Sequence, residues 1–276
     1  MVVIFGRERE QSQLDELLSS CLLGSGRLVL ISGAAGIGKS SLVHWIAESA
    51  VARGALTVEG RCFDLSVTPP YGPWRDLLRR LARTDNPNAL PPGLVSDTTQ
   101  ALGSPSELFE QVRDFLATTS RRQPLLLVLE DVHWSDPPSL NLVRFIGQQI
   151  EEFSILLIIT YRTDELNRRH PLSQLLPTLV REAGASRIEL RPLQETALRE
   201  IVRDRYELSD EAMGRLVDRL SHFAEGNPFY VREMLRDLEE ERVLRPGERR
   251  WTLGNLDRTS VPSLVQQVLE ARIDRL

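Results

Sequence analysis

Three glycines stand just before a lysine and a serine in the run GAAGIGKS, which occupies residues 33–40. Glycine lets successive backbone N–H groups curl around an anion and approach it closely, where a Cβ atom would obstruct them. Lys39 would bring a positive charge on a flexible stem to the β and γ phosphates of a nucleotide, and the Ser40 hydroxyl could bind Mg²⁺. The spacing G-x-x-x-x-G-K-S/T therefore predicts a phosphate-binding loop for ATP or ADP, with a glycine-rich turn and a chance Lys and Ser as the alternative.

We call residues 33–40 the glycine loop. Lys39 is the only lysine of the chain, against 33 arginines. A guanidinium is wider and planar, so a compact, flexible ammonium fits a crowded phosphate site better. The residues predicted to bind nucleotide here are Gly33, Ala34, Ala35, Gly36, Ile37, Gly38, Lys39, Ser40 and Ser41.

Two acidic residues, Glu130 and Asp131, follow the apolar run at residues 125–129. Carboxylates at the tip of a buried strand are costly unless they meet a cation or hydrogen-bond donors. In the Walker B arrangement the first acid holds Mg²⁺, usually through water, and the second polarises the water that attacks the γ phosphate. We therefore expect Glu130 and Ser40 at the metal and Asp131 as the base, with a solvated acidic turn as the alternative.

A further apolar run, residues 155–159, is followed by Thr160 and Arg162. Some nucleotide-binding folds insert one strand between the strand of the glycine loop and that of the acids, and the tip of the inserted strand lies beside the γ phosphate. Thr160 would then bind nucleotide, and Arg162 would detect the γ phosphate and stabilise transition-state charge. The alternative for Arg162 is a surface ion pair with Asp164 or Glu165. The catalytic candidates are Lys39, Glu130, Asp131 and Arg162.

These residues need a scaffold, and the first two thirds of the chain alternate strand and helix patterns. Short apolar runs bounded by polar turns predict strands, and apolar residues at helical spacing predict helices. Wholly apolar runs suit strands that are covered on both faces, as in a parallel sheet. The predicted strands are residues 28–32, 55–61, 125–129, 155–160 and 187–190, and the predicted helices are residues 39–52, 74–83, 107–118, 136–150 and 172–182.

Beyond Pro192 the pattern changes to amphipathic helices and then a hairpin at residues 243–253. Residues 84–105 hold four Pro and two Gly, which predicts a loop insertion. The apolar stripe of residues 263–276 runs to the final residue, so we expect a chain cut from a longer protein. The helices predicted in this part are residues 195–205, 210–223 and 229–241.

Composition argues against several classes of protein. The chain carries 39 acidic and 34 basic residues, a net charge of −5, so it lacks the basic excess of a nucleic-acid-coating protein. Its apolar runs are far shorter than the ~18 residues of a membrane-spanning helix, and the N-terminus has no secretory signal. Cys21 and Cys62 have no His or Cys cluster beside them that could hold a metal. We therefore expect a cytoplasmic protein that enters no membrane and binds no nucleic acid directly through this segment.

Several segments together resemble the AAA+-related P-loop ATPase module of STAND signalling proteins, particularly the large LuxR-type bacterial transcriptional regulators. Residues 260–276 are similar to the start of the winged helix that follows this module in the family. His133 and Trp134 match the family pattern and are expected to pack, and Asp136 is expected to cap a helix. The segments that carry the resemblance are FGRERE at residues 5–10, GAAGIGKSSL at 33–42, LLLVLEDVHWSDPPSL at 125–140, IITYR at 158–162 and EGNPFY at 225–230.

The resemblance implies contacts outside the phosphate site. Phe5, Gly6 and Arg7 would lie near the adenine and ribose, and Pro228 would pack on the base. An ordinary turn between helices is the alternative at Pro228. The implied fold is α/β, a P-loop NTPase of the ASCE/AAA+ type with helices flanking a parallel sheet, followed by a small helical lid and the start of a winged helix. The implied domains are residues 1–192 for nucleotide binding, 193–242 for the lid, and 243–276 for the hairpin and a truncated winged helix.

STAND modules are viewed as switches that ADP holds closed and ATP opens for assembly. We find no arginine finger and no sensor-2 arginine in this sequence, which disfavours fast turnover. The resemblance therefore implies an ATP-binding, slowly hydrolysing regulatory switch, with further domains of the same polypeptide and ATP-dependent self-association as its partners. A hydrolysis-driven or DNA-loading machine is one alternative, and a nucleotide-holding scaffold with little turnover is the other.

Overall fold

The computed structural model describes residues 3–64, 70–85, 104–248 and 250–256. Contacts between residues divide the chain into two units. The first unit carries a sheet with its helices, and the second carries the helices that follow residue 190. The first unit comprises Arg9–Ala35 and Lys39–Leu190, and the second comprises Val3–Glu8, Gly36–Gly38 and the described part of Arg191–Leu276.

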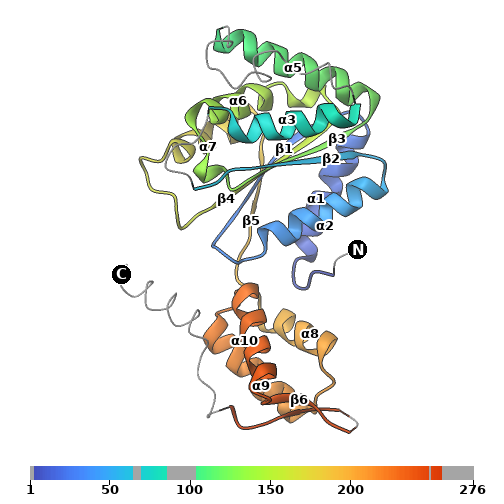
Figure 1. Ribbon diagram of the computed structural model, residues 1–276, viewed down its shortest axis with the longest axis vertical. Helices are drawn as coiled ribbons and strands as arrows, with labels where there is room; N and C mark the ends of the chain where they lie inside the picture. Colours follow the sequence, from blue (N-terminus) through green and yellow to red (C-terminus); the bar gives the residue numbers. More distant parts are fainter. Residues whose placement is uncertain (1–2, 65–69, 86–103, 249, 257–276) are drawn as a thin grey trace. The chain divides into compact units, whose positions relative to one another are not determined.

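A parallel sheet forms the centre of the first unit (Figure 1). Within the described residues it has five strands in the order β2-β3-β4-β1-β5. The strand β4 lies between β1 and β3, as expected for the inserted strand, and the fold class predicted for this part is confirmed. The strands are β1 (Arg27–Gly33), β2 (Leu56–Arg61), β3 (Leu125–Glu130), β4 (Ile155–Arg162) and β5 (Ser186–Glu189).

Burial explains why these segments are strands. Every residue of β3 is buried, and so is every residue of β4 except the last. Such continuous apolar runs are stable as central parallel strands, because layers of helices remove both faces from water. Because the strands are parallel, the carboxyl ends of β1, β3 and β4 lie at one edge of the sheet. That edge carries the residues singled out for phosphate chemistry.

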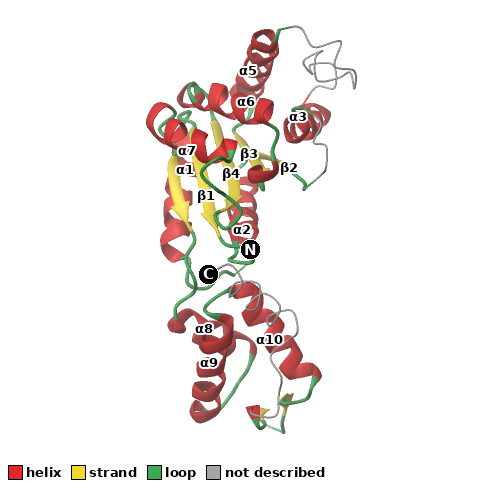
Figure 2. Cartoon of the chain, turned by 90° about the vertical axis from the view of Figure 1, so that its left-hand side faces the viewer, coloured by secondary structure: helices red, strands yellow, loops and turns green. Residues whose placement is uncertain are grey.

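Helices cover both faces of this sheet (Figures 1 and 2). The helices α3, α5, α6 and α7 lie on one face, and α1 and α2 lie on the other. Alternate residues of β3 and β4 belong to the core of the α3 face, as the period of two in a strand requires. The helices are α1 (Glu8–Leu22), α2 (Lys39–Ala52), α3 (Gly72–Asp85), α5 (Pro105–Arg122), α6 (Pro137–Gly147) and α7 (Pro171–Glu182).

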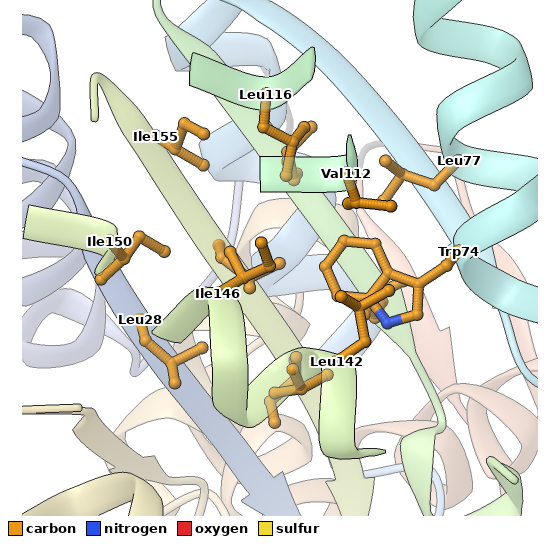
Figure 3. Close-up of a cluster of buried hydrophobic side chains, with 14 of the residues drawn as sticks. Leu28, Trp74, Leu77, Val112, Leu116, Leu142, Ile146, Ile150 and Ile155 are labelled. Carbon is orange, nitrogen blue, oxygen red and sulfur yellow. The ribbon is translucent and has the colours of Figure 1, made fainter. Parts of the chain in front are cut away.

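Trp74 of α3 is fully buried in the core of this face (Figure 3). Its Nε1 donates to the carbonyl oxygen of Ser139 at 3.1 Å, so the polar atom of the ring is satisfied. Leu77, Val112 and Leu142 pack in the same cluster, which joins α3, α5 and α6 to the sheet. This core fixes the helix that follows the acidic pair.

Side-chain caps begin α5 and α6, as well as α7. Asp136 has the capping role expected of it, because its side chain accepts from the backbone N–H of Ser139 at the start of α6. Ser104 and Glu107 form a capping box at the start of α5. The short 3-10 turn Val132–Trp134 connects β3 to α6 and sets the direction of the chain after Asp131.

The helix α1 is one element that the sequence reasoning did not predict. Its buried residues are Leu14, Leu18 and Cys21, which stand at helical spacing on a single stripe. Most of the rest of the helix is polar or charged, so the buried stripe is narrow and the segment resembles a surface connection. Spacing of those three residues was the signal that could have revealed it.

The second unit has the three helices and the hairpin predicted for it. Its buried core includes Leu216, Leu220 and Leu235. Tyr206 is buried beside Trp251 of the hairpin, with the two rings edge to face at 4.9 Å, and its hydroxyl donates to Glu239. The elements are α8 (Glu195–Arg205), α9 (Asp210–Ala224), α10 (Pro228–Glu240), β6 (Leu244–Pro246) and β7 (Trp251–Leu253).

Two predictions fall on parts of the chain that the structure leaves undescribed. The loop expected at residues 84–105 lies largely, and the winged-helix segment expected at residues 260–276 wholly, outside the described residues. Among the helices that are described, none combines the length and apolar character needed to cross a bilayer.

Candidate functional site

The glycine loop joins the end of β1 to α2, which begins at Lys39. Gly36 and Gly38 have φ of +73° and +104°, a left-handed backbone that side chains with a Cβ rarely adopt. A Cβ built on Gly38 would meet no described atom within 4 Å, so the space beside it is open. Ser40 and Ser41 are exposed in the first turn of α2. The loop thus ends at a helix N-terminus, where backbone N–H groups favour an anion.

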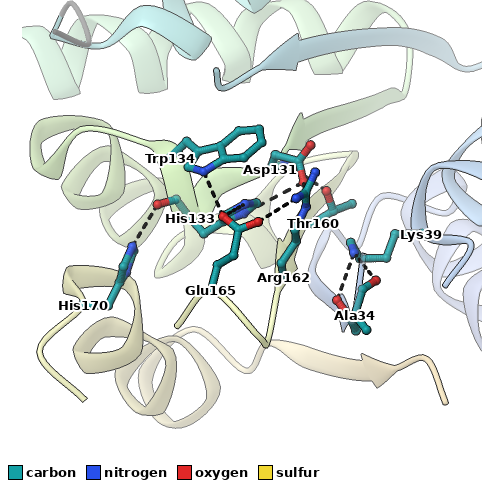
Figure 4. A network of polar contacts seen from close by, with 10 residues as sticks. Ala34, Lys39, Asp131, His133, Trp134, Thr160, Arg162, Glu165 and His170 are labelled. Atoms are coloured by element: carbon teal, nitrogen blue, oxygen red, sulfur yellow. Dashed lines mark hydrogen bonds and ion pairs between the residues drawn. The ribbon is translucent and has the colours of Figure 1, made fainter. Parts of the chain in front are cut away.

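The side chain of Lys39 folds back over this loop (Figure 4). Its Nζ donates to the carbonyl oxygens of Gly33 and Ala34, at 2.9 Å each, and the residue is 8% exposed. Burial lowers the pKa of the amine, and the nearby Asp131 carboxylate opposes that shift. An ammonium has three N–H groups. Since its acceptors among the described residues are these two carbonyls, one donor remains for a phosphate oxygen, and the loop fits a bound nucleotide.

Strand register brings the other predicted residues to the same edge. Arg162 pairs with Gly33 across β1 and β4, so it lies directly beside the first residue of the glycine loop. Glu130 and Thr160 each follow the last residue pair between β3 and β4. The sheet therefore collects the loop, the acids and Arg162 at neighbouring strand ends.

Glu130, the predicted metal ligand, ends β3 with its side chain only 6% exposed. Its Oε2 lies 2.7 Å from Nε of Arg61, which is the residue opposite it at the end of β2. The ion pair supplies the opposite charge that a buried carboxylate needs. Arg61 was not among the residues predicted from the sequence. Its signal was a basic residue at the end of the strand before the acidic one.

Asp131 adopts a left-handed backbone with φ 55° and ψ 44°. Its N–H donates to Oγ1 of Thr160 at 3.0 Å, and its Oδ1 lies 3.8 Å from Nε of Arg162. Thr160 is 2% exposed, so its hydroxyl is engaged in holding the acidic turn. The side chain of Asp131 is 30% exposed, which leaves the carboxylate open to water.

Arg162 makes the ion pair that was the alternative reading for it. Its NH1 donates to Oε1 of Glu165 at 2.6 Å, and its guanidinium lies 4.8 Å from the ring centroid of Trp134 (Figure 4). The side chain is 29% exposed. Arg162 therefore lies at the edge of the sheet where a γ phosphate is expected, while its guanidinium forms an ion pair with Glu165, just after β4.

His133 and Glu165 are site residues that the sequence reasoning did not propose for any chemical role. Nε2 of His133 lies 3.3 Å from Oε2 of Glu165, and the same oxygen accepts from Nε1 of Trp134 at 3.0 Å. The ring of Trp134 packs on that of His133, with the centroids 4.5 Å apart, so the packing expected of these two residues is present. Burial lowers the pKa of His133, against the charges of Glu165 and Asp131.

His170 contacts the backbone of His133 and caps α7. Its Nδ1 accepts from the N–H of Leu172 at 3.1 Å, which caps α7. Nε2 must then carry the proton, and it lies 2.9 Å from the carbonyl oxygen of His133. The start of α7 is thereby tied to the turn that follows the acids.

The residues predicted to contact adenine and ribose belong to the second unit. Arg7 is 5% exposed, and its NH2 donates to the carbonyl oxygen of Ile37 at 3.0 Å. Phe5 and Gly6 are half-buried. Gly6 has φ of +67°, and a Cβ there would lie 2.5 Å from the Cβ of Ala197, so only glycine fits. These contacts hold Arg7 in place, and its role toward a base stays a prediction.

Pro228 is the first residue of α10 in this unit. Asn227 caps the helix by accepting from the N–H of Phe229 at 3.0 Å. The same N–H points to the carbonyl oxygen of Gly36 at 3.3 Å, and a Cβ on Gly36 would lie 2.8 Å from Cβ of Phe229. The start of α10 therefore packs on residue 36 of the glycine loop, and the packing of Pro228 on a base stays a prediction.

The chemistry open to this edge is that of a bound polyphosphate with a divalent cation. Lys39 and Arg162 supply positive charge, and Glu130 and Asp131 supply carboxylates. Among the described residues no group of three or more His, Cys, Asp or Glu could hold a metal ion by itself. Mg²⁺ commonly takes one or two protein oxygens and completes its shell with phosphate oxygens and water, which suits Ser40 and Glu130.

A family model described as AAA ATPase domain matches residues 3–159 of this chain. The match covers more than half of the sequence and includes both the glycine loop and the acidic pair. An uncharacterized protein of Rhizobium meliloti (strain 1021) is 24% identical over 304 residues, which cover 99% of this chain and 28% of that protein. The chain therefore spans little more than a quarter of that relative's length.

Solved structures of low sequence identity share the fold. A STAND protein with a tetratricopeptide repeat sensor from Pyrococcus horikoshii has a TM-score of 0.51 at 19% identity, covering 84% of this chain and 29% of that one. ORC1 of Aeropyrum pernix, in complex with DNA, has a TM-score of 0.56 at 18% identity, covering 99% and 66%. Drosophila ORC bound to DNA has a TM-score of 0.55 at 15% identity, covering 98% and 62%. The likeness is one of fold, and it agrees with the α/β P-loop fold predicted from the sequence.

Proposed function

Because this chain belongs to the AAA ATPase domain family, we propose that it binds ATP and ADP with Mg²⁺ at the glycine loop and hydrolyses ATP slowly. The observation that carries the proposal is the position of the Lys39 amine. It is buried against the carbonyl oxygens of Gly33 and Ala34, with one donor left for a phosphate, and Gly33 pairs with Arg162 across β1 and β4. A lone buried ammonium in a glycine turn is best explained by an anionic ligand.

Each residue at the carboxyl edge of the sheet has one role in ATP binding or hydrolysis. Lys39 binds the β and γ phosphates, and residues 33–41 supply backbone N–H groups and the Ser40 hydroxyl. Ser40 and Glu130 would hold Mg²⁺, which would supply positive charge to neutralise the phosphates. Asp131, partly open to water, polarises the attacking water molecule. These are the roles of Walker A and Walker B residues.

Thr160 and Arg162 complete the γ-phosphate side. The Thr160 hydroxyl already holds the N–H of Asp131, so its contribution to nucleotide binding is to position that acid. Arg162 senses the γ phosphate, which ADP lacks. In the second unit, Phe5, Gly6, Arg7 and Pro228 contact the adenine and ribose.

We assign this ATPase to a regulatory switch within a longer signalling protein of the STAND type, such as a large LuxR-type transcription regulator. The matched relative is more than three times as long as the matched region, which supports a module joined to further domains. The sequence offers no arginine finger for a preformed ring, which supports slow turnover. The ATP-dependent self-association that we propose rests on the resemblance to STAND modules. The second candidate is a DNA-loading ATPase, because two of the similar structures are of ORC proteins bound to DNA. The net charge of −5 weighs against it.

The test is to identify any nucleotide that copurifies with the protein and to measure binding of Mg·ATP and Mg·ADP by calorimetry. We expect micromolar or tighter binding of both and turnover below ~1 per second, the low end of typical enzymes. Lys39→Ala should abolish binding of Mg·ATP while the protein stays folded by circular dichroism. Unchanged binding in that variant would refute the phosphate site. Turnover well above that rate, stimulated by DNA, would favour the DNA-loading candidate.

A further inference from the structure

The carboxylate of Glu165 lies between three partners at the γ-phosphate edge (Figure 4). Oε1 accepts from NH1 of Arg162 at 2.6 Å. Oε2 accepts from Nε1 of Trp134 at 3.0 Å, and Nε2 of His133 lies 3.3 Å from the same oxygen. The two oxygens therefore have different partners. Oε1 binds Arg162, and Oε2 contacts the turn that follows Asp131.

The turn that holds Oε2 is packed around the buried ring of His133. The His133 side chain is 1% exposed, and within the described part of the chain neither of its ring nitrogens makes a hydrogen bond. Its ring is packed under Trp134. The carbonyl oxygen of His133 is tied to His170 at the start of α7. Glu165 is thus anchored through Oε2 to a buried, packed segment, while Arg162 on Oε1 is 29% exposed and free to change partner.

We propose that Glu165 is a positioning residue that holds Arg162 in an ion pair when no γ phosphate is bound. ATP can then bind the guanidinium only by displacing the carboxylate of Glu165. This inference rests on the proposed nucleotide function. The γ phosphate of ATP can replace the carboxylate of Glu165 as the partner of Arg162, and ADP has no such phosphate. The ion pair therefore subtracts from ATP affinity and leaves ADP affinity unaffected, which shifts the resting protein toward ADP.

The contacts of Oε2 explain why Glu165 can lose Arg162 at a low cost in free energy. When Arg162 leaves, Oε2 keeps the indole N–H of Trp134, and the imidazole of His133 remains within 3.3 Å. The carboxylate is also about one third exposed, so water can replace the guanidinium at Oε1. The guanidinium in turn lies over Trp134 and beside Asp131, so its new position need not be far from its old one.

The test compares the dissociation constants of Mg·ATP and Mg·ADP for the wild type and Glu165→Gln, measured by calorimetry. A glutamine keeps an oxygen for Trp134 and removes the charge that holds Arg162. We expect ATP to bind about two- to five-fold more tightly, the range of an exposed ion pair, with ADP unchanged. The effect should vanish when the same substitution is made in an Arg162→Gln background, because the coupling acts through Arg162.

Glu182→Gln is the matched control. Glu182 is 32% exposed and pairs with Arg144 at 2.8 Å in the same unit, so its loss removes a similar ion pair elsewhere. Glu165→Ala is a second variant, and thermal melting checks that each protein is folded. A lower or unchanged ATP-to-ADP affinity ratio in both Glu165 variants overturns the proposal, as does an equal change in Glu182→Gln. A wild type that binds neither nucleotide overturns the proposed function itself. Binding of both nucleotides, with the same ATP-to-ADP affinity ratio in the wild type and the Glu165 variants, overturns only the proposed role of Glu165.

Discussion

The backbone N–H of Asp131 donates to Oγ1 of Thr160 across 3.0 Å, joining the turn after β3 to the end of β4. Asp131 has a left-handed backbone, a conformation that Asn and Asp adopt more often than other residues with a Cβ. Thr160 is buried and Asp131 is partly exposed, so the hydrogen bond ties the turn to a buried strand. It thereby sets the direction of the carboxylate to which we assign the activation of water.

Replacing Thr160 by Val tests that relationship. The substitution keeps the shape of the side chain and leaves the N–H of Asp131 without its acceptor, which should lower the free energy of unfolding by about 1–3 kcal/mol. A misdirected carboxylate should lower the rate of ATP hydrolysis by about ten- to a hundred-fold, with a smaller effect on ATP affinity. Single-turnover phosphate release and urea unfolding measure the two effects. Thr160→Ser keeps the hydroxyl and should recover both, and a Ser variant as slow as Val would contradict this role.

Asp131→Asn separates binding from hydrolysis. The amide keeps the size of the side chain and cannot act as a base, so ATP should bind normally while hydrolysis falls by about 10²- to 10⁴-fold. Glu130→Gln should instead raise the Mg²⁺ concentration needed for ATP binding. Calorimetry across a Mg²⁺ series and phosphate release distinguish the two variants. Unaltered hydrolysis in Asp131→Asn would transfer the role of base to Glu130.

Arg61→Ala should destabilise the protein chiefly when no Mg²⁺ nucleotide is bound. The buried carboxylate of Glu130 would lose its 2.7 Å partner, and because Arg61 is 59% exposed we expect a cost of about 1 kcal/mol. Mg·ADP brings a cation to the same carboxylate, so it should raise the melting temperature of the variant more than that of the wild type. Differential scanning fluorimetry with and without Mg·ADP measures both shifts. Equal stabilisation of the two proteins would mean that Glu130 meets no metal.

The strands follow from local sequence signals, whereas the place of β4 between β1 and β3 was expected from the class of nucleotide-binding folds that the motifs indicate. Runs such as residues 125–129 are wholly apolar, and only a buried parallel strand suits them. The glycine loop has a spacing that ties Lys39 to a strand before it and a helix after it. By contrast, α1 buries only a narrow stripe, although its buried residues stand at helical spacing. Its Glu, Arg, Gln and Leu residues are good helix formers, so the sequence contained a signal for this helix that the reasoning did not use.

Partners of the site residues depend on register and on loop geometry, which a single sequence does not contain. Arg61 meets Glu130 because β2 and β3 pair at those two positions, across more than sixty intervening residues. The sequence named Glu165 as one of two possible partners of Arg162, and the turn after β4 selects it. The sequence therefore predicted which residues gather at the edge, and the structure supplies the ion pairs that they make.

The solitary lysine allows a chemical test of the glycine loop. Lysine-selective acylation can modify only Lys39 and the N-terminal amine, because all other basic side chains in the chain are Arg or His. Burial lowers the pKa of Lys39, so a larger fraction of the amine is unprotonated and reactive at alkaline pH. Bound ATP should cover the amine and, through its negative charge, raise that pKa. We expect Mg·ATP to slow modification of Lys39 at least ten-fold in peptide mass analysis, with the N-terminal amine as the internal control. Equal rates with and without nucleotide would contradict a phosphate contact.

Stability should fall in mild acid because of His133. Burial is the main cause that lowers its pKa in the folded protein below the ~6.5 of an unfolded histidine, and the carboxylates of Glu165 and Asp131 oppose the shift only in part. Between the two pKa values the unfolded chain binds more protons than the folded one. Stability therefore rises with pH, and it is lost as the pH falls below about 6.5.

His133→Gln removes this titration and should flatten the difference in the free energy of unfolding between pH 7.5 and pH 5.5, by about 1 kcal/mol. Urea unfolding at the two pH values measures it, and each variant is compared with its own stability at pH 7.5 so that lost packing cancels. His44→Gln is the control, because it removes a histidine whose side chain is 62% exposed. A slope as steep in His133→Gln as in the wild type would show that the acid sensitivity resides in other groups.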